Sequence, residues 1–154
     1  MGASRGSVKV RRHSMFRHIL FAHNATPAAE RALIYLEHLA RLEEASVIVL
    51  HIYESPDRYT ATAGYGALVE QYERVAREVV DDSVGHLQSV GIDAVGMVAA
   101  DRSPAHAILQ TARDEEASLI VLGTRGPAKM ADILLGDVST EVLRNARCPV
   151  FLVP

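Results

Sequence analysis

The chain has 154 residues, of which 49% are hydrophobic and 23% are charged, a composition typical of one folded globular domain rather than of a disordered chain. Its formal net charge of −3 gives no electrostatic basis for binding nucleic acid or an anionic membrane, and no apolar run approaches the roughly 18 residues of a membrane span. The single cysteine excludes an intrachain disulfide and suits a reducing, cytoplasmic compartment.

The first 14 residues are expected to lie outside the folded domain. The stretch before Ser14 carries four basic residues and no acidic one. A secretory signal would need an apolar central region after this basic start, and the sequence has none. We therefore expect residues 1–14 to be a mobile basic extension or a cloning remnant, and residues 15–154 to form one domain. A nucleic-acid-binding arm is the alternative interpretation.

The first predicted strand spans residues 16–23 and is apolar on both sides, as in a parallel strand covered by helices on both faces. Thr26 and Pro27 then predict a helix start, with Thr as N-cap and Pro at the first helical position. Apolar residues at helical spacing continue to about Arg41. A second strand is predicted over residues 46–53.

Proline and glycine predict a loop over residues 54–66. Helical spacing resumes at about residue 67 and continues to Val90, with Gly91 in the position of a helix C-cap. The third strand is predicted over residues 92–99, with Gly96 as an interruption that weakens it.

The last third of the chain repeats this alternation. Ser103 and Pro104 predict another helix start, residues 119–122 a fourth strand, residues from about 138 a last helix, and residues 148–153 a fifth strand. Five strands that alternate with four helices predict a single α/β domain with a parallel sheet and helices on both faces. Ligands of such sheets bind at the carboxyl ends of the strands.

Three glycines lie between the fourth strand and the last helix, at positions 123, 126 and 136. Glycine lets backbone N–H groups approach a ligand closely, and a helix N-terminus adds a partial positive charge. This strand–loop–helix segment therefore predicts an anion site. The ends of the first and second strands, at residues 23–25 and 52–53, are its expected neighbours.

With two and then nine residues between its glycines, this segment resembles the signature of the universal stress protein family. The resemblance extends over residues 15–154 and includes the flanking strands, which read Ile19–Asn24, Val49–Ile52, Ser118–Gly126 and Arg147–Val153. It implies a Rossmann-like fold of the adenine nucleotide alpha hydrolase type and a homodimer made through the final strand, Val150–Val153. The family contains members that bind adenine nucleotides and members that do not.

In the nucleotide-binding members, the glycine loop and a small hydroxyl residue after the last glycine hold the phosphates. An acidic residue after the first strand faces the adenosine, and backbone groups after the second strand meet the adenine. The resemblance thus implies a stress-response module that binds ATP or AMP, with or without Mg²⁺, as a sensor or switch. The implied site residues are Ala22, His23, Asn24, Ile52, Gly123, Thr124, Arg125, Gly126, Gly136, Asp137, Val138 and Ser139.

Three positions depart from the pattern of the nucleotide binders. Asn24 replaces the acidic residue, Ala25 follows where glycine is usual, and Asp137 replaces the hydroxyl residue after Gly136. At an effective dielectric constant of about 20, two like charges about 4 Å apart repel by about 4 kcal/mol. This is as large as the whole free energy of millimolar binding, about −4 kcal/mol.

Asp137 leaves two interpretations open. Its carboxylate is well placed to satisfy N–H groups of its own helix and so to fill the anion site, in which case no nucleotide binds and the protein is a dimeric interaction module. Alternatively, it points away or meets the phosphates through a cation, with Arg125 and Lys129 as compensating charges. Asn24 either contacts the nucleotide or forms a turn with its own backbone.

The sequence assigns no catalytic residue and no metal site. It lacks a nucleophile elbow, paired catalytic carboxylates and a P-loop lysine, so a slow ATP hydrolase is the third and least favoured interpretation. The seven histidines include no pair four residues apart. His23 and His106 are the two that are expected to approach the site, where proton transfer would require suitable geometry.

Overall fold

The computed structural model describes residues 14–57, 60–124 and 136–154, and within them the predicted alternation of strands and helices is confirmed. The strands are β1 (His18–Ala22), β2 (Ser46–Tyr53), β3 (Ala94–Ala100), β4 (Leu119–Gly123) and β5 (Val150–Val153). The helices are α1 (Pro27–Glu43), α2 (Tyr65–Ser89), α3 (Pro104–Asp114) and α4 (Asp137–Asn145). None of these helices is long and apolar enough to cross a lipid bilayer.

The five strands form one parallel sheet in the order β3-β2-β1-β4-β5. In the centre, Phe21 of β1 lies opposite Val49 of β2 on one side and Val121 of β4 on the other. The chain runs from β1 outward to β3 and then returns to β4, so the direction of winding switches between β1 and β4. The carboxyl ends of these two strands therefore border a crevice suited to a ligand.

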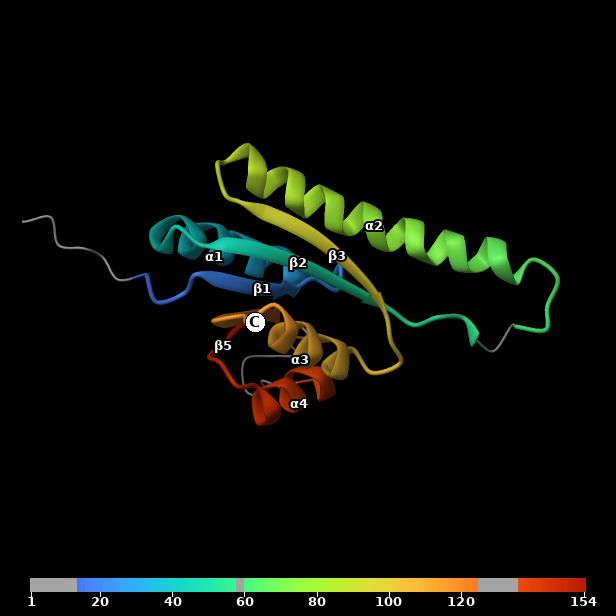
Figure 1. Cartoon of the computed structure of the whole chain (residues 1–154). Helices are drawn as coiled ribbons and strands as arrows, with labels where there is room; N and C mark the ends of the chain where they lie inside the picture. The colour runs from blue at the N-terminus through green and yellow to red at the C-terminus, as the bar shows by residue number, and fades with distance from the viewer. Residues whose placement is uncertain (1–13, 58–59, 125–135) are drawn as a thin grey trace, which may run out of the picture.

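Helices cover both faces of the sheet, as the sequence predicts: α1 and α2 lie on one face, and α3 and α4 on the other (Figure 1). Ile19 and Phe21 of β1 pack with α1 and α2, whereas Leu20 and Ala22 pack with α3 and α4. Successive strand residues point to opposite faces, and both sets are buried. This double coverage explains why β1 is a continuous apolar run.

The helix starts at Thr26 and Ser103 are confirmed. The Thr26 side chain accepts a hydrogen bond from the Ala29 N–H at 3.3 Å, and the Ser103 side chain accepts one from the His106 N–H at 3.2 Å. Each cap satisfies one of the N–H groups that a helix start leaves without a partner.

Several predicted boundaries are shifted by two residues, and one prediction about a strand interior is wrong. β1, β3 and β5 each begin two residues later than predicted, and α2 begins two residues earlier. β3 continues through Gly96, which lies opposite Val49 in the ladder, so the glycine does not interrupt it. A Cβ atom at Gly96 would collide with the Val80 side chain. The glycine therefore permits close packing of α2 on β3.

Candidate functional site

A cavity of about 400 Å³ opens at the carboxyl ends of β1 and β4, on the face covered by α3 and α4. The ends of β1, β2 and β4 form part of its wall, and the first two turns of α3 and the start of α4 form the rest. The residues that line it are Ala22, His23, Asn24, Ile52, Pro104, Ile108, Leu122, Gly123, Gly136, Asp137, Val138 and Ser139. The cavity thus lies where the strand order predicts a ligand site.

Nine of the twelve residues implied by the sequence line this cavity, so most of the implied site is brought together. Thr124 does not line the cavity. It is buried, and its N–H donates to the Val153 carbonyl oxygen at 2.7 Å. Thr124 therefore ties the end of β4 to β5. Arg125 and Gly126, and the compensating base Lys129, lie outside the described residues.

Three lining residues are absent from the sequence-based set: Pro104, Ile108 and Leu122. Pro104 begins the helix that follows β3, and the rule that ligands bind at strand ends could have suggested it. Ile108 lies one turn further along the helix, where its helical spacing indicates only a core residue. Leu122 is the last leucine of β4 and gives no signal beyond that of a buried strand.

At the start of α4, three backbone N–H groups border the cavity. Gly136 is the N-cap residue, with an extended backbone and no side-chain capping bond, and the Thr140 N–H is the first to bond back into the helix, to the Gly136 carbonyl oxygen at 3.0 Å. The N–H groups of residues 137–139 precede this bond and have no partner within the helix. They combine with the helix dipole to favour an anion.

Asp137 is exposed at this helix end. Among the described residues, no group donates a hydrogen bond to its carboxylate, including the N–H groups of its own helix. The buried Ser139, two positions further on, supplies a hydroxyl group in the cavity wall.

Asn24 has the structural role that the sequence left as one alternative. Its side-chain oxygen accepts hydrogen bonds from the Thr26 hydroxyl at 2.6 Å and the Thr26 N–H at 3.4 Å. Between them Ala25 adopts a left-handed conformation with φ of 57°, which explains why glycine suits this position in the family pattern. The Asn24 oxygen is engaged by the turn, which leaves its amide NH₂ as the group to meet a ligand.

His23 turns its imidazole away from the cavity, toward α1. By strand alternation it shares a face with Phe21, and the two rings meet edge to face with centroids 5.3 Å apart. Its Nδ1 accepts from the Ala25 N–H at 3.0 Å, so Nε2 carries the proton. Nε2 is buried and lies 3.1 Å from a Glu30 carboxylate oxygen, outside hydrogen-bonding geometry.

Burial lowers the pKa of His23 below its ordinary value of 6.5, and the nearby Glu30 carboxylate partly opposes this shift. The His106 Nδ1 lies within hydrogen-bonding distance of an Asp101 carboxylate oxygen, at 2.9 Å, and His106 is not part of the cavity wall. The two histidines expected near the site therefore do not present their rings to it. Among the described residues, no group of three or more His, Cys, Asp or Glu is arranged to hold a metal ion.

Known proteins resemble this chain over nearly its whole length. The model of the universal stress protein family matches residues 15–154. A universal stress protein of Thermus aquaticus, encoded in the 3′ region of a QAH/OAS sulfhydrylase gene, is 32% identical over 139 residues, which cover 90% of this chain and 99% of the relative.

Solved structures share the fold. That of protein MJ0577 from Methanocaldococcus jannaschii has a TM-score of 0.78 at 24% identity and covers 90% of this chain and 96% of its own. The universal stress protein from Archaeoglobus fulgidus in complex with dAMP has a TM-score of 0.66 at 22% identity (91% and 99% covered). A universal stress protein in complex with cAMP has a TM-score of 0.65 at 19% identity (90% and 96% covered).

The matched family model covers every element from β1 to β5, and the glycines at positions 123 and 136 border the cavity at the switch point of the sheet. The chain belongs to the universal stress protein family.

Proposed function

We propose that this protein binds an adenine nucleotide, ATP or AMP, in the cavity between β1 and β4, and that binding acts as a sensor or switch. The observation that carries this proposal is the start of α4, whose first N–H groups have no partner among the described residues and border a cavity that is otherwise largely apolar. The choice of an adenine nucleotide is supported by the dAMP and cAMP complexes of two structural neighbours.

The cavity lining has an apolar part and a hydrogen-bond-donating part, which suit the two parts of a nucleotide. Ala22, Ile52, Ile108 and Leu122 offer an apolar surface for the base and ribose. The N–H groups of residues 137–139 offer donors and a favourable dipole for the phosphates. The volume of about 400 Å³ lies in the range of cofactor sites.

Asp137 decides the affinity in this proposal. Its exposed carboxylate accepts no hydrogen bond from the described residues, so it does not consume the helix donors there. It does stand beside the phosphates, and repulsion between charges about 4 Å apart amounts to about 4 kcal/mol at a dielectric constant of about 20. We therefore expect weak binding that Mg²⁺ strengthens, because the cation bridges carboxylate and phosphate.

The melting temperature in the presence of millimolar ATP, AMP or cyclic AMP, each with and without Mg²⁺, tests this proposal. A ligand at about 100 times its dissociation constant stabilises the folded state by about 2.7 kcal/mol. Asp137→Ser removes the repulsion and is expected to bind AMP at least about tenfold more tightly. Phosphate release above a control without protein tests the hydrolase alternative in the same samples.

Val138→Asp provides the opposite change. It adds a second acid at the phosphate end of the cavity and should abolish the nucleotide-dependent shift. Ala67→Asp is the matched control, because it places the same charge in the exposed first turn of α2, far from the cavity. If neither the wild type nor Asp137→Ser is stabilised by any nucleotide, the proposal is wrong and the non-binding interaction module replaces it.

We also propose that the protein is a cytoplasmic homodimer paired through β5. This strand is at one edge of the sheet, and among the described strands it is bonded only to β4. Phe151 on β5 is 40% exposed and contacts Tyr35 of α1, which is 56% exposed, with ring centroids 6.2 Å apart. An exposed apolar strand edge invites pairing with another strand, and a second copy offers the same strand.

A further inference from the structure

A second cavity lies at the opposite end of the sheet, beside the start of β4. Its volume is about 270 Å³. It lies between the last turns of α3 and the segment that joins α4 to β5. The residues that line it are Leu109, Ala112, Arg113, Glu116, Ala117, Ile120, Asn145, Ala146, Arg147 and Cys148. None of them lines the nucleotide cavity, so the two cavities are separate.

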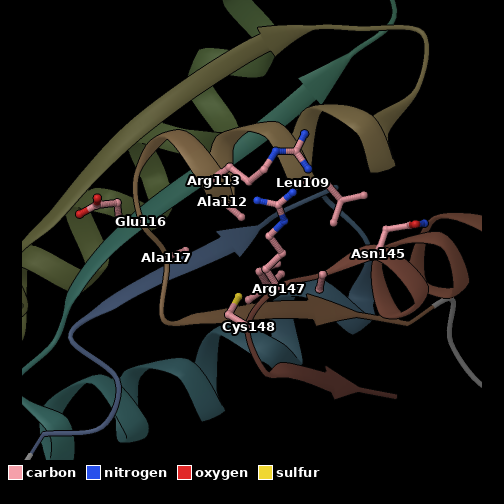
Figure 2. A pocket seen from close by; sticks show the side chains of 10 residues that line it. Leu109, Ala112, Arg113, Glu116, Ala117, Asn145, Arg147 and Cys148 are labelled. Carbon is pink, nitrogen blue, oxygen red and sulfur yellow. The ribbon is translucent and has the colours of Figure 1, made fainter.

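Two arginines from different segments dominate this second cavity. In Figure 2 the Arg147 side chain extends across it toward Arg113, and the Glu116 carboxylate points away from both. Arg113 donates a hydrogen bond to the neutral Gln110 side chain at 2.8 Å. Within the part of the chain that the structure describes, no carboxylate forms an ion pair with either arginine. The cavity therefore has two positive charges against the one negative charge of Glu116, and neither arginine is held in an ion pair with a described carboxylate.

The position of Arg113 can be explained without a ligand. The carbonyl groups at a helix C-terminus attract a positive charge, and Arg113 lies in the last turn of α3. This explanation does not apply to Arg147, which lies outside the helices, in the segment between the end of α4 at Asn145 and β5. Two guanidinium groups that reach one cavity from separate segments form paired donors for the oxygen atoms of a carboxylate or a phosphate.

Beneath the arginines the cavity is apolar. Ile120 is fully buried, and Leu109 is 7% exposed. Cys148 is half-buried, and burial raises the pKa of its thiol. The thiol stays protonated near neutral pH and acts as an apolar surface rather than as a nucleophile. An apolar floor under a charged rim suits a ligand that has an anionic head and a small apolar body.

We propose that this cavity binds a small organic anion, with its carboxylate or phosphate held between Arg113 and Arg147 and its apolar part against Leu109 and Ile120. The site is separate from the proposed nucleotide site, because the two cavities share no lining residue. Its volume limits the ligand to a molecule smaller than a nucleotide, such as an aromatic acid or a phosphate monoester.

Phenyl phosphate and benzoate are suitable probes, and benzyl alcohol is the neutral control. We would titrate each into the isotopically labelled full chain at constant ionic strength and follow the backbone amide signals by NMR. We expect at least one anion to give saturable shifts at the amides of Arg113 and Cys148, and benzyl alcohol to give none. The tighter of the two anions identifies the preferred head group.

Single substitutions test the two arginines. Arg113→Gln and Arg147→Gln should each weaken binding of the anion by about tenfold or more, as expected for loss of a charge-assisted hydrogen bond. Arg144→Gln is the matched control, since it removes the same charge from the last turn of α4 at a residue that does not line the cavity. Its effect should stay below about twofold.

Four results would each overturn the proposal. They are shifts confined to the nucleotide cavity, shifts that do not saturate, binding of benzyl alcohol as tight as that of the anions, and equal weakening by Arg144→Gln. Equal weakening by Arg144→Gln would show that the anions are attracted by the overall positive charge of this surface rather than by Arg113 and Arg147. All three arginines are exposed, so the variants are expected to fold.

Discussion

At the scale of single residues, His23 illustrates how one position can serve two purposes. Its backbone follows the end of β1 beside the cavity proposed to bind a nucleotide, and its N–H donates to the Leu50 carbonyl oxygen at 2.9 Å. Its imidazole is buried on the other face and holds the Ala25 N–H. The turn that positions Asn24 therefore depends on His23 remaining neutral, because a protonated Nδ1 cannot accept a hydrogen bond.

This dependence predicts acid sensitivity. Burial lowers the pKa of His23 in the folded state below 6.5, while Glu30 opposes and His51 adds to the shift. His23 has its ordinary pKa of about 6.5 in the unfolded chain and a lower pKa in the folded protein. At a pH between these two values the unfolded chain binds more protons than the folded protein, so the free energy of unfolding decreases as the pH falls below about 6.5. Urea unfolding at a series of pH values should show a smaller decrease in His23→Asn, whose side-chain oxygen still accepts from Ala25.

His38→Asn is the control for this experiment, because His38 is exposed on α1. It should keep the pH profile of the wild type. A profile of His23→Asn that also matches the wild type would show that His23 does not carry the acid sensitivity.

Packing against α1 gives a structural reason for glycine at position 123, in addition to its place in the glycine motif. A Cβ atom there would lie 2.5 Å from the backbone of Ala28 and Ala29 at the start of α1, which cannot rotate away as a side chain can. Gly123→Ala should therefore destabilise the fold by about 1–3 kcal/mol or more through overpacking. Gly66→Ala, at an open position in the first turn of α2, should change stability by less than about 0.5 kcal/mol.

Chemical denaturation measures both variants. A Gly123→Ala variant as stable as the wild type would mean that α1 can shift to accept the methyl group. In that case the glycine would be explained by ligand approach alone.

At the scale of elements, α2 shows how backbone conformation alone separates two glycines that are both exposed. Gly85 lies inside the helix, and Gly91 follows its C-cap with φ of 84°; an added Cβ atom would meet no heavy atom within 4 Å at either position. Only the backbone conformation distinguishes them. A helix interior disfavours glycine, whereas a left-handed C-terminal position requires it.

Alanine at these two positions should therefore have opposite effects. Gly85→Ala should raise the free energy of unfolding by about 0.5–1 kcal/mol, because alanine is the better helix former. Gly91→Ala should lower it by about 1–2 kcal/mol, the cost of a left-handed conformation with a side chain. Midpoints of urea unfolding measure both, and changes of the same sign would contradict the assigned end of α2.

At the scale of the whole molecule, the two edges of the sheet differ in what surrounds them. β3 carries Val95, which is 54% exposed, and β5 carries Phe151, which lies beside the exposed Tyr35 of α1. The proposed dimer uses only the β5 edge. A disruptive substitution on β5 should therefore dissociate the proposed dimer, and the same kind of substitution on β3 should not.

Phe151→Lys should convert the proposed dimer to a monomer for two reasons. The substitution removes the apolar phenyl ring, and a two-fold interface brings the two introduced lysines, which carry like charges, close together. Val95→Lys is the matched control on the opposite edge and should leave the dimer intact. Light scattering at micromolar concentration measures both. A monomeric wild type, or equal dissociation by Val95→Lys, would contradict pairing through β5.

Local patterns in the sequence predicted much of the fold and of the site. The span of β2 and the caps at Thr26 and Ser103 follow from apolar runs and capping chemistry, which act over a few residues. The position of the cavity at the ends of β1 and β4 was predicted in outline because parallel strands end at one edge of a sheet. His23 was assigned to the site without its orientation, although alternation from Phe21 indicates that the ring faces away.

The sequence by itself determined the alternation of strands and helices, the family, and the segments that meet at one end of the sheet, since periodicity and glycine spacing are local properties. Only the tertiary structure decided the strand order, the contact of Gly123 with α1, and the presence of Arg113 and Arg147 at one second cavity. These features depend on contacts between residues distant in the chain. Such contacts form when helices pack on both faces of the sheet, and no local pattern encodes them.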